Sequence, residues 1–87
     1  MIPQVRDLKI WPEHFAALLD GSKPFEVRNN DRGYRVGDVL ELREWEPQIG
    51  KRGYTGRSTF RTVTYIYAGD MMAAGYVVLG LAAVKKD

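Results

Sequence analysis

The order of apolar and polar residues predicts one helix near the start of the chain, between two short strands. Residues alternate in character over Val5–Ile10, which is typical of a strand. The segment Pro12–Asp20 carries apolar residues at helical spacing, and Pro12 suits the first helical position because its missing N–H needs no partner there. Gly21 adopts positive φ without strain and is expected to end the helix. A strand is then predicted over Pro24–Asn29.

The rest of the chain is rich in residues that favour strands. Turn-forming residues at 29–33 and 36–38 precede a strand in which Leu40 and Leu42 share one face. The later predicted elements are a hairpin loop over Pro47–Gly56, a strand over Arg57–Tyr67, a link over Gly69–Gly75 with one helical turn at Met71 and Met72, and a last strand over Tyr76–Val84. One helix with five or six short strands predicts an α+β fold. We expect a small, mostly antiparallel β-barrel, because closure removes exposed sheet edges.

The composition fits one domain over residues 1–87 and narrows the chemistry. With 87 residues, 45% of them hydrophobic, the chain can form a single core. Cysteine is absent, which excludes disulfides and thiolate catalysis. Only one histidine is present, so we expect no metal site, and no cofactor is predicted.

The charge and hydropathy of the chain point to a protein outside the membrane. The formal net charge of +2 is compatible with nucleic-acid binding but does not require it. We find no basic segment followed by an apolar run at the N-terminus, and no run of about 20 apolar residues that would span a bilayer. A cytoplasmic location without membrane contact is therefore predicted.

The segment Gly21–Arg28 places three charged side chains beside a turn. Alternate residues of a strand point to opposite faces, so Glu26 and Arg28 share one face, and Lys23 stands at the turn before them. One ammonium, one carboxylate and one guanidinium in this arrangement could hold a base, a nucleotide or a phosphate. The alternative is a solvated charged face whose ion pairs only tie the helix to the strand.

Further residues could extend a binding surface around this array. Arginine binds phosphates and base edges in bidentate fashion, and aromatic rings stack on unpaired bases. Glu26 could orient Lys23 or accept a hydrogen bond from a base amine. The candidate ligand- or nucleic-acid-binding residues are Lys9, Lys23, Glu26, Arg28, Asn30, Arg43, Trp45, Lys51 and Arg52. A place in the barrel wall is the alternative for Trp45, and a solvated hairpin tip is the alternative for Lys51 and Arg52.

The chain offers little for catalysis. Nucleophilic hydrolysis needs an activated Ser, Cys, Thr or Lys beside a base. His14 is the only histidine, and we expect it on the surface or half-buried. Lys23 with Glu26 is the one pair that could transfer protons, so these two residues would be catalytic if the protein were an enzyme.

The succession of short motifs resembles a known family. The pattern Gly21-x-Lys23-x-x-Glu26-x-Arg28 is similar to the signature of the ASCH domains, which are relatives of the PUA RNA-binding fold. Flanking motifs follow in the same order at residues 8–15, 30–32, 36–40, 42–45 and 75–80. The combination resembles DUF3850, a PUA-like family of small bacterial and phage proteins, over about residues 8–81.

The resemblance implies a PUA-like barrel and two functions. The first is a binding module for RNA, a nucleotide or a modified base, with its cleft at the helix–strand corner. The alternative is an amidohydrolase, because some ASCH proteins remove acyl groups from N4-acylated cytidine with the motif Lys, a Thr, and a Glu from a helical insertion. Lys23 matches that set, whereas Glu26 stands in place of the Thr and no insertion is evident. A protein-interaction module with a purely structural motif is a third reading.

Overall fold

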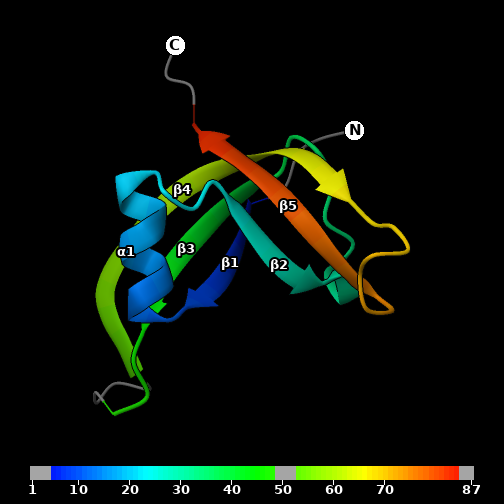
Figure 1. Cartoon of the computed structure of the whole chain (residues 1–87). Coiled ribbons are helices and arrows are strands. Elements are labelled where there is room, and N and C mark those ends of the chain that lie inside the picture. Colours follow the sequence, from blue (N-terminus) through cyan, green and yellow to red (C-terminus); the bar gives the residue numbers. More distant parts are fainter. Residues whose placement is uncertain (1–4, 49–52, 85–87) are drawn as a thin grey trace.

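The computed structural model describes residues 5–48 and 53–84, and in this part of the chain it contains one α-helix and five strands (Figure 1). In chain order the elements are β1 (Val5–Ile10), α1 (Pro12–Asp20), β2 (Phe25–Asn29), the 3-10 turn η1 (Asn30–Arg32), β3 (Val39–Trp45), β4 (Tyr54–Tyr67) and β5 (Tyr76–Ala83). The predicted bounds of the first strand and of the helix are confirmed. Gly21 follows α1 with φ 86°, as expected of a residue that ends a helix.

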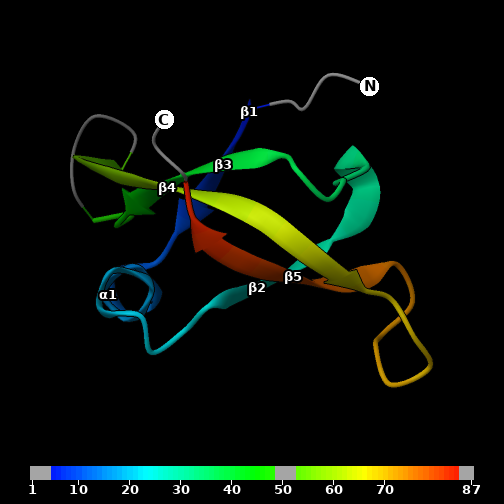
Figure 2. The ribbon, with the colours of Figure 1, turned by 90° about the horizontal axis from the view of Figure 1, so that it is seen from above.

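The five strands form one sheet in the order β1-β3-β4-β5-β2. Among these described strands only β1 and β3 run parallel, so the prediction of a mostly antiparallel sheet is confirmed. The sheet curls into a half-barrel, with α1 beside it (Figures 1 and 2). The prediction of a closed barrel is wrong, because β1 and β2 lie at opposite ends of the sheet and no backbone pairing joins them among the described residues.

The hydrophobic core lies on the inner face of the curled sheet. Along β3, Leu40 and Leu42 are fully buried and alternate with partly exposed residues, which confirms the predicted face. The buried apolar residues are Leu8, Ile10, Phe15, Leu18, Tyr34, Leu40, Leu42, Val63, Val77, Leu79 and Leu81. Helix α1 contributes only Phe15 and Leu18 to this cluster, while Trp11 and Leu19 at its two ends stay about half exposed.

Two predicted connections differ from the structure. Strand β4 begins at Tyr54 rather than Arg57, so the predicted loop over Pro47–Gly56 is too long. The sequence suggested a loop there because of its glycines, but Gly56 is part of the strand with φ 95°. The described segment between β4 and β5 contains turns and no helical turn, and the N–H of Met72 donates to the Gly69 carbonyl at 2.9 Å.

No helix among the described residues is long and apolar enough to cross a membrane.

Candidate functional site

A tight turn after α1 fixes the position of Lys23. The backbone N–H of Lys23 donates to the Ala17 carbonyl of the helix at 3.1 Å. Asp20 accepts the backbone N–H of Ser22 at 2.8 Å. The side-chain hydrogen bond from Ser22, together with this backbone one, holds the pKa of Asp20 below its ordinary value. The chain therefore reaches β2 in a defined conformation, with Lys23 at the corner.

Strand β2 turns its charged side chains inward and its apolar side chains outward. Glu26 is only 5% exposed, whereas Phe25 and Val27 are 40% and 46% exposed. The register with β5 explains this orientation, because Glu26 lies opposite the buried Leu79 and residues opposite one another share a face. The sequence pattern gave the two faces correctly but did not indicate which of them faces the core.

The buried carboxylate of Glu26 holds two cations. Lys23 Nζ lies 2.5 Å from Glu26 Oε1, and Arg28 Nε lies 3.2 Å from Glu26 Oε2. The Glu26 side chain is 6% exposed, and those of Lys23 and Arg28 are 18% and 28% exposed. The three side chains whose spacing suggested an array do lie together, and we call them the Glu26 triad.

The edge strands β1 and β2 face each other across a gap that two arginines bridge. We call this gap the edge seam. Arg28 Nη2 donates to the Lys9 carbonyl at 2.7 Å, and Arg32 Nη1 donates to the Asp7 carbonyl at 2.9 Å. These carbonyls belong to the free edge of β1. Side-chain donors thus satisfy backbone groups that a neighbouring strand would pair in a closed barrel.

A pocket of about 800 Å³ opens at the edge seam, on the side of α1. Its lining residues are Lys9, Ile10, Trp11, His14, Lys23, Phe25, Glu26, Val27, Arg28, Asn29 and Tyr76. Lys9, Lys23 and Arg28 against Glu26 give it a formal surplus of two positive charges. Its size is that of pockets for small ligands, and it joins the Glu26 triad to aromatic rings.

Neither of the predicted residues Trp45 and Arg43 lines this pocket, but Trp45 contacts two residues that do, whereas Arg43 contacts Asp7 and Tyr54. The Trp45 ring packs edge-on against Trp11, with ring centroids 5.4 Å apart. Lys9 Nζ lies 4.9 Å from the centre of the Trp45 ring. Arg43 stacks on Tyr54, with its guanidinium 3.8 Å from the ring centre.

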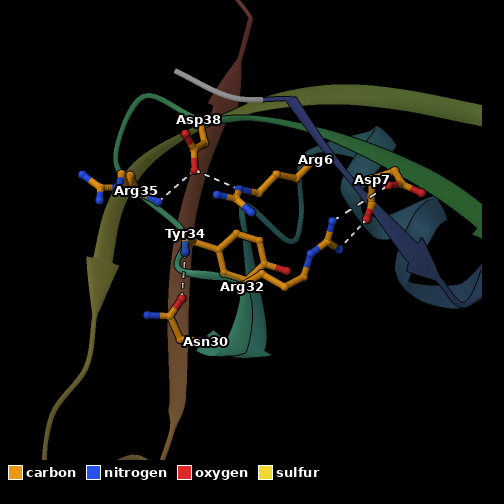
Figure 3. Close-up of polar contacts among 7 residues, drawn as sticks. All are labelled: Arg6, Asp7, Asn30, Arg32, Tyr34, Arg35 and Asp38. Atoms are coloured by element: carbon orange, nitrogen blue, oxygen red, sulfur yellow. Dashed lines mark hydrogen bonds and ion pairs between the residues drawn. The ribbon is translucent and has the colours of Figure 1, made fainter. Parts of the chain in front are cut away.

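Asn30 lies outside the pocket and has a structural contact. Its side-chain oxygen accepts the backbone N–H of Tyr34 at 2.9 Å (Figure 3). In the same cluster, the buried Asp38 accepts bonds from Arg6 Nε at 3.3 Å and from the Arg35 N–H at 2.9 Å. Lys51 and Arg52 lie outside the described residues.

The sequence did not single out several residues of the seam. Trp11 lines the pocket and directly precedes the first proline of α1. That position between β1 and α1 could have indicated an aromatic side chain beside the predicted site. Tyr76 reaches the pocket because it lies opposite Asn29, a pairing that local pattern does not reveal. Arg32 was visible only as part of a turn. Within the described residues no cluster of three or more histidine and carboxylate side chains could hold a metal ion.

Comparison with known proteins shows that these features lie within the range of a known sequence family. A family model described as "Domain of unknown function (DUF3850)" matches residues 5–81. The chain is also similar to an "Uncharacterized 12.9 kDa protein in GpA 3'region" of Escherichia phage P2, with 30% identity over 79 residues. That alignment covers 91% of this chain and 69% of the phage protein. The range matched by the family model includes the Glu26 triad and both edge strands.

Proposed function

The chain belongs to the DUF3850 family, and we propose that it is a binding module for RNA, a nucleotide or a modified base. The ligand occupies the pocket between β1, α1 and β2. The observation that carries the proposal is the Glu26 triad, in which one buried carboxylate holds Lys23 and Arg28 at the pocket. We also propose that the half-barrel is a form of the PUA-like fold, because the ASCH-like signature lies at this corner.

Glu26 positions the two cations and does not itself contact the ligand. Both of its oxygens already accept hydrogen bonds from charged donors, and its side chain is 6% exposed. Lys23 and Arg28 have further N–H groups, and neither residue carries an acceptor. The ligand must therefore bring acceptor atoms, such as phosphate oxygens, base carbonyls or ring nitrogens. Of the two roles expected of Glu26, orienting Lys23 or accepting a hydrogen bond from a base amine, the proposal takes the first.

The walls of the pocket supply the remaining part of a nucleotide site. Trp11, Phe25 and Tyr76 line it and are 50%, 40% and 42% exposed. Exposed aromatic faces stack on bases, and each such contact contributes about 1–3 kcal/mol. The surplus of positive charge favours an anionic ligand. A nucleotide can contact both parts of the pocket at once, because its base can stack on the aromatic side chains and its phosphate can bind the cations.

Titration calorimetry with the four nucleoside 5′-monophosphates and with short oligoribonucleotides tests the proposal. Lys23→Gln and Arg28→Gln should each weaken binding by about tenfold to hundredfold, the usual cost of losing a charged hydrogen bond. Arg35→Gln is the matched control, because Arg35 is exposed, lies away from the pocket and loses the same charge. If no probe binds at low salt, the triad is purely structural and the protein-interaction reading takes its place.

The amidohydrolase remains a second candidate because the Lys23–Glu26 contact lies at the pocket. Its difficulty is that a general base must reach the reacting proton, whereas the Glu26 carboxylate is covered by two cations. Incubation of the protein with N4-acylated cytidines decides the question. Turnover that falls by about 10²–10⁴ in both Lys23→Ala and Glu26→Ala would make hydrolysis the function. Turnover that survives both changes would indicate a contaminating enzyme.

A further inference from the structure

The edge seam continues beyond the pocket into a second hollow. This hollow has a volume of about 290 Å³ and is lined by Asp7, Leu8, Lys9, Arg28, Arg32 and Tyr54. It shares Lys9 and Arg28 with the pocket, so the two hollows lie on either side of Arg28 along β1. The seam is thus a groove with two compartments and an arginine between them.

Positive charge accompanies the groove along its whole length. Arg32 lines the second compartment, and Arg43 contacts its lining residues Asp7 and Tyr54. The two arginines lie 3.9 Å and 3.8 Å from the carboxylate of Asp7. All three side chains are between 38% and 55% exposed. Ion pairs this exposed are weak, so a phosphate can compete for both arginines. The partly exposed Tyr54 ring also lines this compartment, and Arg43 stacks on one of its faces.

A phosphate bound at Lys23, which lines the pocket but not the second compartment, does not also reach Arg32, which lines the second compartment but not the pocket. The backbone from Asp7, in the second compartment, to Trp11, in the pocket, spans about 13 Å at the usual rise of a strand. A phosphate oxygen accepts hydrogen bonds only from donors within about 3 Å. A mononucleotide whose phosphate lies at Lys23 would therefore leave Arg32 and Arg43 without a phosphate contact.

We infer that the ligand is a single strand of two or more nucleotides that runs along the edge seam, an inference that rests on the proposed function. One nucleotide lies in the pocket against Lys23 and Arg28. The phosphate that joins it to its neighbour lies between Arg28 and Arg32. The neighbouring base stacks beside Tyr54.

Binding as a function of ligand length tests the inference. We expect oligouridylate and oligoadenylate of four residues to bind at least about tenfold more tightly than the corresponding monophosphates, because additional phosphates and bases are engaged. Arg32→Gln should weaken tetranucleotide binding and reduce the slope of log K against log salt by about 0.7, the value for one single-strand phosphate contact. It should leave monophosphate binding unchanged. Arg35→Gln, with the same loss of charge nearby in sequence, should change neither.

The outcomes separate this inference from the proposed function. Equal affinities for monophosphate and tetranucleotide, both insensitive to Arg32→Gln, would overturn the strand inference and leave the pocket as a mononucleotide site. Absence of binding for both probes would overturn both proposals. Arg32 also bonds to the backbone of β1, so Arg43→Gln provides a second variant that leaves that bond in place. It should weaken only the tetranucleotide.

Discussion

At the scale of single residues, Glu26 is the side chain on which the site depends. A buried carboxylate is unfavourable unless its charge is paired and its oxygens accept hydrogen bonds. Lys23 and Arg28 meet both conditions, one at each oxygen. The same contacts hold the two cations at the pocket, so stability and the proposed binding rest on one carboxylate.

Removal of the Glu26 charge should destabilise the fold. In Glu26→Gln, Lys23 and Arg28 would face each other without a counter-charge, and we expect the free energy of unfolding to fall by about 2 kcal/mol. The cost is below that of a fully buried pair because both cations are partly exposed. Urea denaturation measures it, with Glu13→Gln on the exposed face of α1 as control. Equal losses in the two variants would contradict the role given to Glu26.

Asp20 should titrate below its ordinary range. Its carboxylate accepts hydrogen bonds from Ser22, which lowers its pKa in the folded state. The stabilisation is therefore fully present above the unfolded pKa and is lost as the pH falls through the lower folded pKa. A carboxyl-detected NMR titration should show Ser22→Ala raising the midpoint toward the ordinary value, while Ser58→Ala on β4 leaves it unchanged. An unmoved midpoint in Ser22→Ala would contradict the assignment.

At the scale of elements, β2 shows what the local alternation of residues can predict about a strand and what it cannot. Alternation predicted correctly that Glu26 and Arg28 share a face. It could not tell that this charged face turns inward, because the orientation follows from the register with β5, a strand far away in sequence. Helix α1 was predicted in full because its first proline and its final glycine are local signals.

Because the apolar side chains of β2 face outward, truncation of two valines should reduce the free energy of unfolding by unequal amounts. Val27 on β2 is 46% exposed and Val77 on β5 is 3% exposed. Val77→Ala should reduce the free energy of unfolding by about 2–3 kcal/mol, since it removes buried methyl groups and leaves a cavity. Val27→Ala should cost less than about 1 kcal/mol. Thermal and urea unfolding measure both, and a larger loss for Val27→Ala would mean that its face is covered.

At the scale of the whole molecule, the sheet that the described strands form ends at β1 and β2 instead of closing into a barrel. The sequence indicated strands but not their order, and closure depends on that order. Exposed edges invite pairing with other chains, and proteins protect them with charged side chains. Arg28 and Arg32 occupy the β1 carbonyls and line the hollows, so they protect this edge at the place where the ligand is proposed to bind.

Hydrogen exchange should reveal the free edge of β2. The Leu81 N–H donates to Pro24, and the Asn30 N–H donates to Gly75, so the even-numbered residues of β2 pair with β5. The amides of the odd-numbered residues then point into the edge seam. NMR-detected exchange should be much faster at Val27 than at Glu26 and Arg28. Uniform protection along β2 would show that another chain or segment covers the edge.

The pairing of β2 with β5 also determines when the sheet can form during synthesis of the chain. Phe25 pairs with Gly80 and Asn29 with Tyr76, so these partners are about 50 residues apart along the chain, and contacts of such long range form slowly. A ribosome releases the helix and β2 early, but within residues 5–48 and 53–84 β2 pairs only with β5, the last of the described strands. The nascent chain therefore carries Glu26 and its two cations without their scaffold until translation has passed β5.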